Sequence, residues 1–189
     1  MRYRRRHKYS LVSLILAVLL VVATQSGWLS KPAQVAQQNQ PGLYSVAHFV
    51  DGDTIDVNMD GRTETVRFIG VDTPETHRPN TPVQCYGPEA AAYTKSIIGS
   101  SKLRLQADPL DTNRDRYGRL LRYIFLQDGT LVQEKLVSEG YAFAYTQFPF
   151  QKKQQFVDEQ AQAKAAKKGL WGACTVTVES NGRQQTNDR

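Results

Sequence analysis

The sequence is poor in cysteine, has no internal repeat and contains a single long apolar run. Two cysteines among 189 residues exclude a small scaffold held by many disulfides and allow one intrachain pairing. The lack of a repeat excludes collagen-like and solenoid architectures. An apolar share of 40% excludes a wholly disordered chain, because it is enough to form a hydrophobic core. The length therefore suits one ordinary domain with appendages.

Most of the chain also lacks a strong excess of charge of either sign. Lysine and arginine total 24 against 18 aspartate and glutamate residues, but five of the basic residues lie in the opening "MRYRRRHKYS", which contains no acidic residue. The remaining 19 basic residues are nearly balanced by the 18 acidic ones. Binding to a polyanion would therefore depend on local clusters of basic residues and not on a global field.

The one long apolar run, residues 11–23, directly follows the basic opening. It is short for a membrane span and typical of the central region of an export signal, with cleavage expected after Ala23. The alternative is an uncleaved membrane anchor. In both cases residues 1–23 predict export of the rest of the chain, which would be secreted, periplasmic or anchored on the outer side of the cytoplasmic membrane. Residues 24–41, rich in glutamine, are expected to be a flexible linker.

Residues 42–175 are expected to form one α+β domain. Alternating apolar and polar residues predict strands before and after the Asp60-Gly61 turn, with further strands near 102–107 and 119–127. Helices are predicted over about 87–100, 130–140 and 150–168. Short turns between the early strands favour a small antiparallel sheet or barrel. Residues 176–189 are expected to be a polar, solvated tail.

The segment "VDGDTIDV", residues 50–57, contains three carboxylates in a region that otherwise predicts a strand. These are Asp51, Asp53 and Asp56. Aspartate is uncommon in strands and common in turns, so the segment alone is more typical of a turn than of a metal site.

Two arginines interrupt apolar strands further along the chain. Arg67 precedes Asp72, Thr73 and Glu75 in "VRFIGVDTPET", and Arg119 occupies a similar position in "NRDRYGRLLRYIF". A buried arginine requires an anion, which here is either a nearby carboxylate or a phosphate of the substrate. The other arginines of the second segment, Arg114, Arg116 and Arg122, are expected to be solvated or paired with Asp111 and Asp115.

Carboxylates and arginines together favour a metal-assisted site for phosphoryl chemistry. Asp53 and Asp72 would bind a hard cation, while Arg67 and Arg119 would bind the phosphate oxygens. Glu75 would orient or deprotonate a water molecule for attack.

Four segments in this order, "VDGDT", "RFIGVDTPE", "YGPEAAAYTK" and "DRYGRLLRYIF", resemble the thermonuclease, or staphylococcal nuclease-like, family. The resemblance covers about residues 44–171. It implies a five-stranded OB-fold β-barrel with three α-helices, and an exported nuclease that hydrolyses DNA and RNA with Ca²⁺ and leaves 3′-phosphates. From the residues alone, magnesium would also suit two carboxylates, a carbonyl and water.

Carried over by position, the resemblance assigns each site residue a role. It implies calcium ligands at Asp53, Asp72 and the Thr73 carbonyl, phosphate-binding arginines at Arg67 and Arg119, and a general base at Glu75. It also implies substrate-binding tyrosines at Tyr117 and Tyr145, although the segment around Tyr145 is one residue shorter than the family pattern.

The loop after Glu75 departs from the family pattern, with two prolines, His77 and Cys85. Export to an oxidising compartment favours a disulfide between Cys85 and Cys174 over two buried thiols. That disulfide would stiffen a loop that borders the active site in the family. His77 is a candidate base or metal ligand, although a lone histidine in a loop is more often solvated.

Two functions of different classes remain open from the sequence. One is an exported calcium-dependent endonuclease acting on DNA and RNA, and the other is a barrel that binds single-stranded nucleic acid or protein without cutting it. The nuclease is favoured because every acidic and arginine position is present. A monomer is expected, with a membrane tether only if residues 11–23 are retained.

Overall fold

A tight hairpin near the start of the domain illustrates how local sequence determines this fold. In the computed structural model, which describes residues 42–76 and 82–189, β2 (Thr54–Met59) and β3 (Arg62–Phe68) are joined by Asp60 and Gly61. Both residues have positive φ, 49° and 78°, as a two-residue hairpin turn of the I′ type requires. The predicted Asp60-Gly61 turn is therefore confirmed. The proposed export signal, the linker and His77 lie outside the described residues.

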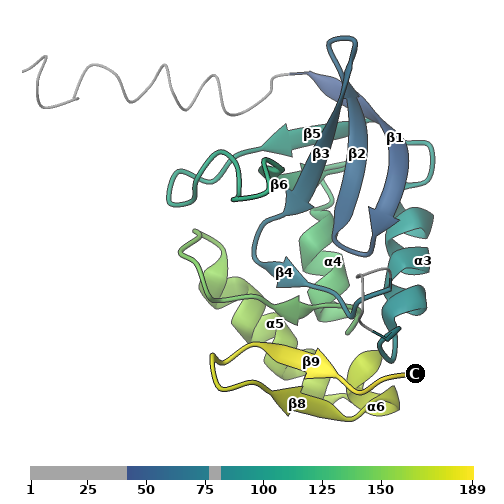
Figure 1. Cartoon of the computed structure of the whole chain (residues 1–189), viewed down its shortest axis with the longest axis vertical. Coiled ribbons are helices and arrows are strands. Elements are labelled where there is room, and N and C mark those ends of the chain that lie inside the picture. The colour runs from purple at the N-terminus through teal and green to yellow at the C-terminus, as the bar shows by residue number, and fades with distance from the viewer. Residues whose placement is uncertain (1–41, 77–81) are drawn as a thin grey trace, which may run out of the picture. The chain divides into compact units, whose positions relative to one another are not determined.

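Five strands close into a barrel in the order β1-β2-β3-β6-β5. They are β1 (Leu43–Asp51), β2, β3, β5 (Leu103–Gln106) and β6 (Leu120–Phe125). All neighbouring strands are antiparallel except β3 and β6. Register shifts in β1 bend this strand so that it pairs with both β2 and β5. With its helices, this barrel confirms the expected α+β OB-fold class (Figure 1).

Three helices accompany the barrel: α3 (Gly87–Ile98), α4 (Val132–Ser138) and α5 (Lys153–Ala165). Helices α3 and α4 contact barrel strands, whereas α5 packs against α4. Helix α4 contacts both α3 and α5 (Figure 1). The third helix is shorter than residues 150–168, because Lys167 and Gly169 adopt positive φ and reverse the chain before the four-residue helix α6 (Leu170–Ala173). Two short strands, β4 (Val71–Asp72) and β7 (Phe143–Ala144), pair with each other below the barrel.

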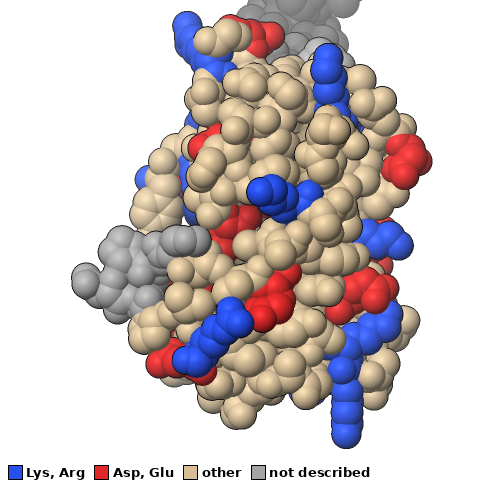
Figure 2. Space-filling model, turned by 90° about the vertical axis from the view of Figure 1, so that its right-hand side faces the viewer, with Lys and Arg blue, Asp and Glu red and all other residues tan. Residues whose placement is uncertain are grey.

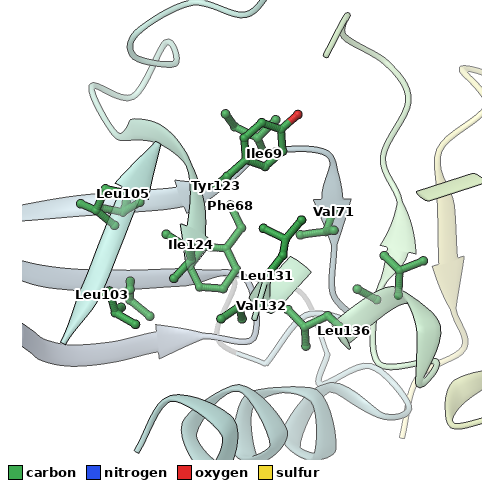
Figure 3. Packing of buried hydrophobic residues seen from close by; sticks show 14 of the residues in the cluster. Phe68, Ile69, Val71, Leu103, Leu105, Tyr123, Ile124, Leu131, Val132 and Leu136 are labelled. Carbon is green, nitrogen blue, oxygen red and sulfur yellow. The ribbon is translucent and has the colours of Figure 1, made fainter. Parts of the chain in front are cut away.

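The core lies between the barrel strands and α4. Figure 3 shows Phe68 and Ile124 from the barrel facing Leu131 and Val132 at the start of α4. These side chains are at most 5% exposed. Burial of side chains of this size contributes about 1.5–3 kcal/mol each relative to exposure, so this layer fixes the barrel on the helices. No helix among residues 42–76 and 82–189 is long and apolar enough to cross a membrane.

The C-terminal segment differs from the expected solvated tail. Strands β8 (Val176–Val178) and β9 (Gln184–Thr186) form an antiparallel hairpin, drawn in yellow in Figure 1 at the end of the molecule away from the β2–β3 turn. Cys85 and Cys174, 89 residues apart, form a disulfide at the base of this hairpin. The predicted disulfide is therefore confirmed, and the expectation for residues 176–189 is corrected.

Candidate active site

The three carboxylates of residues 50–57 have different surroundings. Asp51 accepts hydrogen bonds from the Gly52 N–H at 2.8 Å and from Thr76 Oγ1 at 2.9 Å, so it holds the turn together. Asp56 accepts a 2.6 Å hydrogen bond from Thr65 across the β2–β3 pair. Asp53 alone is both buried and paired with an arginine. Of the three, Asp53 is therefore the carboxylate that lies beside Arg67.

Arg67 lies between two buried carboxylates. Its Nη1 is 2.5 Å from Asp53 Oδ2, and its Nη2 is 2.9 Å from Asp72 Oδ1. Burial lowers the pKa of the Arg67 guanidinium, but the charges of Asp53 and Asp72 more than reverse this, and the net pKa is raised. The anions that meet Arg67 in this structure are thus the carboxylates themselves, the first of the two alternatives predicted from the sequence.

Asp72 comes from β4, which pairs with β7 and lies directly after the barrel strand β3. Burial raises the pKa of Asp72 and the nearby Asp53 carboxylate adds to the rise, whereas Arg67 and Arg183 oppose it. The two oxygens of Asp72 have different partners, because Oδ1 accepts from Arg67 and Oδ2 accepts from Arg183 Nε at 2.9 Å. Asp72 is therefore the point at which two guanidinium groups meet.

Thr73 is held against the β1–β2 turn. Its backbone N–H donates to Asp53 Oδ2 at 2.9 Å, and a Cβ added to Gly52 would lie 2.8 Å from Thr73 Oγ1. The glycine is therefore needed for this close approach. Thr73 Oγ1 is buried and finds no hydrogen-bond partner among the described residues. Such an atom is normally satisfied by a polar ligand or by water.

The oxygen atoms of Asp53, Asp72 and Thr73 are the donors that calcium and magnesium prefer, and water commonly completes their coordination. Within the described part of the chain, no group of three or more His, Cys, Asp or Glu side chains has a spacing suited to a metal ion. A cation held here would therefore use two carboxylates, threonine oxygens and water, and this set of donors fits a hard cation.

Glu75 follows β4 in a segment whose backbone is fixed by a later residue. The Glu75 N–H donates to Gln84 Oε1 at 2.8 Å, and the Gln84 N–H donates to the Glu75 carbonyl at 2.9 Å. Gln84 is adjacent to the disulfide at Cys85. The half-buried Glu75 is therefore placed three residues beyond Asp72 on a backbone that the disulfide region supports.

Arg119 lies just before β6 on the strand beside Arg67. Since Arg67 pairs with Leu121 in the parallel β3–β6 register, Arg119 lies on the same face two residues earlier. Strand spacing and rise place the two Cα atoms roughly 8 Å apart. Arg119 Nε is 2.7 Å from Asp115 Oδ2, and its guanidinium carbon is 5.4 Å from the centre of the Tyr117 ring. The structure therefore brings the two predicted arginines to one face of the barrel.

The two predicted substrate-binding tyrosines differ in exposure. Tyr117 is 65% exposed, and its hydroxyl accepts a 2.6 Å hydrogen bond from Arg116. Tyr145 is half-buried, its N–H donates to the Gly70 carbonyl at 2.8 Å, and its ring centre is 6.0 Å from that of Phe148. The Tyr145 hydroxyl also helps to raise the pKa of both Arg67 and Arg183, so it lies near the two guanidinium groups.

The surface charge agrees with the nearly balanced count in the sequence. On the face shown in Figure 2, acidic and basic side chains are interspersed and do not gather into one broad basic field. Attraction of a polyanion would therefore rely on the local arginines of the site.

Comparison with known proteins places this arrangement in a family. The family model described as "Staphylococcal nuclease homologue" matches residues 65–173, which include Arg67, Asp72 and Arg119. The chain belongs to the staphylococcal nuclease family. It is 42% identical over 161 residues to a thermonuclease of Staphylococcus hyicus, covering 85% of this chain and 92% of that protein. It is 46% identical over 127 residues to a thermonuclease of Staphylococcus intermedius, covering 67% of this chain and 73% of that protein.

A third relative of this nuclease family comes from another genus. Endonuclease YncB of Bacillus subtilis (strain 168) is 44% identical over 138 residues, covering 71% of this chain and 64% of that protein. These matches confirm the predicted thermonuclease resemblance, and with the barrel they confirm a nuclease fold and family.

The sequence did not predict the role of Arg183, and the prediction for Arg122 was wrong. Arg183 reaches Asp72 from the C-terminal hairpin, and its signal was the Asn181-Gly182 pair, a typical hairpin turn between two short strand-like runs. Arg122 was expected to be solvated or paired with an aspartate, but it is 0% exposed. Its position in an apolar strand buries it, and a buried guanidinium needs hydrogen-bond partners. One of them is the Asn113 side chain, to which Arg122 donates at 2.6 Å.

The partners of the remaining predicted arginines also differ from expectation. Arg114 pairs with Glu64 at 2.8 Å and not with Asp111 or Asp115, since the segment before β6 folds back toward β3. Burial and the nearby Arg114 charge lower the pKa of Arg122 to about 10. Arg122 is thus a structural arginine, whereas Arg67 and Arg119 lie on the face of the barrel that carries the site.

Proposed function

We propose that this protein is an exported, calcium-dependent nuclease that hydrolyses phosphodiester bonds in DNA and RNA and leaves 3′-phosphates. The observation that supports this best is the Arg67 guanidinium between Asp53 and Asp72, with Arg119 on the same face of the neighbouring strand. Membership of a family of nucleases supports hydrolysis, and the oxygen donors support a hard cation.

Asp53, Asp72 and the Thr73 carbonyl would hold the cation. When bound, Ca²⁺ supplies positive charge that stabilises the negative charge developing on the phosphate. Its binding would neutralise the carboxylates that now engage Arg67, and the guanidinium N–H groups would become available for phosphate. Arginine has five N–H donors in a fixed fork, so Arg67 can also keep one carboxylate contact while it binds a phosphate oxygen.

Arg119 would bind the phosphate from the adjacent strand. Its Nε donates to Asp115, so its terminal N–H groups are directed by that contact. Both guanidinium groups would donate to the non-bridging oxygens, where charge increases during attack. Glu75 would accept a proton from the attacking water. The water oxygen would form a bond to phosphorus, the bond from phosphorus to the 5′ oxygen would break, and that oxygen would take up a proton from solvent.

The tyrosines would position the nucleotide chain. Tyr117 presents an exposed ring beside Arg119, and Tyr145 lies near Arg67. Base stacking on aromatic side chains is tolerant of sequence, which suits a nuclease that acts on both DNA and RNA.

Export is supported by two features that are far apart in the chain. The apolar residues 11–23 follow a basic opening, and Cys85 forms a disulfide with Cys174, which persists in oxidising compartments. We place the protein outside the cytoplasm: secreted, periplasmic, or tethered at the outer face of the membrane. It would act there as a monomer.

This function is tested by measuring how the full chain hydrolyses denatured DNA and RNA. The assay is run with Ca²⁺, with Mg²⁺ and with chelator. We expect both substrates to be cut with Ca²⁺ but not with Mg²⁺ or chelator, and we expect Arg67→Gln to lose this activity. Arg62→Gln, an exposed arginine at the other end of β3, is the matched control and should cut normally. A folded protein that binds single-stranded nucleic acid but cuts under no condition would establish the binding-module alternative instead.

A further inference from the structure

Arg183 reaches a carboxylate of the site from the far end of the chain. Its Nε donates to Asp72 Oδ2 at 2.9 Å, although 111 residues separate the two in sequence. The side chain of Arg183 is 25% exposed and that of Asp72 is 10% exposed, so water screens this ion pair only in part. The two charges are therefore held together in a partly buried setting.

The position of Arg183 is fixed by its own hairpin. The Arg183 N–H donates to Asn181 Oδ1 at 2.7 Å, and the Arg183 carbonyl accepts from the Glu179 N–H at 2.8 Å. These bonds close the turn between β8 and β9, where Gly182 has a φ of 83°. Arg183 is thus held at the start of β9 and is not an extended side chain on a loose tail.

The hairpin is in turn fastened to the segment that supports Glu75. Cys85 makes two of the hydrogen bonds that do so: its N–H donates to the Asn187 carbonyl at 2.7 Å, and its carbonyl accepts from Thr186 Oγ1 at 2.8 Å. A third bond runs from the Arg189 N–H to the Val83 carbonyl at 2.9 Å. The disulfide between Cys85 and Cys174 fastens the chain just before β8, at the same base of the hairpin. These bonds keep Arg183 directed at Asp72.

The two guanidinium groups compete with a cation for the same carboxylate. Oδ1 of Asp72 accepts from Arg67 and Oδ2 accepts from Arg183, so both oxygens already have a positive partner. A divalent cation bound to Asp72 would lie close to the Arg183 charge, and like charges at such distances repel. In the absence of the cation, the same guanidinium compensates a buried negative charge that would otherwise be costly.

We propose that Arg183 is a positioning residue of the cation site, an internal counter-ion of Asp72 that weakens cation binding. It acts through Asp72, and it does so from a hairpin that the disulfide holds in place. This inference rests on the proposed function, because it takes Asp72 to be a cation ligand. Arg183 then stabilises the Asp72 carboxylate when the cation is absent, and the cation stabilises it when bound. Each of them weakens the interaction of the other with Asp72.

Direct titration of the full chain with Ca²⁺ alone, without nucleic acid, tests this by calorimetry. Arg183→Gln should bind Ca²⁺ more tightly, by about 5- to 150-fold, the usual range for coupling between two sites. Arg183→Lys keeps the charge and should remain closer to the unmodified protein. Arg183→Met keeps an apolar stem without charge, and it replaces the glutamine variant if that one does not fold.

The control for loss of one positive charge is Arg189→Gln in the same C-terminal segment. Arg189 pairs with Glu89 at 3.4 Å, whereas the described partners of Asp53 and Asp72 among the arginines are Arg67 and Arg183. The calcium affinity of Arg189→Gln should therefore stay within about twofold of the unmodified value, since distant surface charges are screened. Thermal unfolding gives a second measure: Ca²⁺ should raise the midpoint more in Arg183→Gln than in Arg189→Gln.

Asp72→Asn separates failure of this inference from failure of the proposed function. If Asp72→Asn binds Ca²⁺ as tightly as the unmodified protein, Asp72 is not a ligand, and the cation site of the proposed function is overturned together with the role of Arg183. If Asp72→Asn loses binding but Arg183→Gln binds Ca²⁺ no more tightly than Arg189→Gln, only the role of Arg183 is overturned. Tighter binding confined to the Arg183 variants that lack the charge supports it.

Discussion

Arg119 and Asp115 form a closed pair at the start of β6. The Arg119 Nε is 2.7 Å from Asp115 Oδ2, and the Arg119 N–H donates to Asp115 Oδ1 at 3.0 Å. One carboxylate therefore fixes both the backbone and the guanidinium of this arginine. The terminal N–H groups are thereby directed without the help of substrate, which is the kind of preorganisation that stabilises a transition state at low cost.

Replacing Arg119 should therefore impair catalysis more than folding. We expect Arg119→Gln to lower turnover by about 100-fold or more, by analogy with the loss of one transition-state donor. The side chains of Arg119 and Asp115 are 30% and 17% exposed, and Arg119→Gln keeps the backbone N–H bond to Asp115. A partly screened ion pair contributes about 0–1 kcal/mol to stability, so thermal unfolding should change little. Steady-state hydrolysis of denatured DNA measures the first effect. Normal turnover in a folded Arg119→Gln protein would remove Arg119 from the proposed site.

Asp53 should contribute to stability even without a cation. From the sequence alone, two nearby carboxylates suggest repulsion that removal of one would relieve. The structure reverses that expectation, because Asp53 accepts from Arg67, from the Thr73 N–H and from Thr54 Oγ1. Asp53→Asn should cost about 1–3 kcal/mol in chelator, the usual cost of leaving buried donors poorly paired.

Urea unfolding in chelator measures this cost, and a calcium titration of the same variant should show weakened binding. Asp56→Asn is the matched control, since Asp56 lies three residues further along the chain, in β2, and accepts from Thr65, while its ion-pair partner is His48 and not an arginine. A gain in stability for Asp53→Asn would mean that repulsion between the carboxylates outweighs their pairing with Arg67.

Cation binding should weaken as the pH falls. Burial raises the pKa of Asp72 above its ordinary value, so a proton competes with the cation for this carboxylate at a higher pH than for an exposed aspartate. In chelator, Asp72 should therefore make the protein less stable as the pH rises, whereas an aspartate with a lowered pKa makes a protein more stable. The stability associated with protonated Asp72 is present below the ordinary pKa and is lost as the pH rises through the raised pKa.

Calcium affinity and the free energy of unfolding, each measured from about pH 4 to pH 8, test this dependence. Asp72→Asn should flatten the pH profile of stability in chelator, because its amide does not titrate. A calcium affinity that stays constant across this range would show that the charges of Arg67 and Arg183 dominate over burial at Asp72.

Patterns along the chain predicted the barrel and much of the site, because they depend on local rules. The Asp60-Gly61 turn, the alternating strands and the arginines in apolar strands each follow from short-range geometry. The same rule did not identify Arg122, which was expected to be solvated or paired with an aspartate but is buried in β6, where it donates to oxygen atoms of Asn113. A strand pattern indicates that an arginine interrupts an apolar run, but not whether the fold buries it or which partner it supplies.

The C-terminal hairpin was not predicted, because its stability comes from contacts far away in the sequence. Strands of three residues, β8 and β9, have little intrinsic stability as an isolated pair. They are fixed by hydrogen bonds to residues 83–85 and by the disulfide. The pairing of the two cysteines could be predicted from their number and from the expected oxidising compartment. The polar residues beyond Cys174, in contrast, resemble those of any solvated tail.

The disulfide should link global stability to the arrangement of the site. It joins residues 89 apart, and closing a loop of that length stabilises a chain by at most about 4–5 kcal/mol through the unfolded state. Cys85→Ser with Cys174→Ser should therefore unfold at lower urea concentration. It should also loosen two contacts that start next to Cys85: the Gln84 bonds to Glu75 and the Asn187 bond of the hairpin.

The double variant tests both effects if it is compared with the oxidised and the reduced unmodified protein. Reduction should match the double variant in unfolding midpoint, because both remove the same cross-link. If the disulfide is needed to hold Arg183 at Asp72, the double variant should also bind Ca²⁺ more tightly, as Arg183→Gln does. If the calcium affinity is unchanged and only the stability falls, hydrogen bonds alone hold the hairpin at Asp72. In that case the disulfide serves folding, and the site is held by the contacts of residues 83–85.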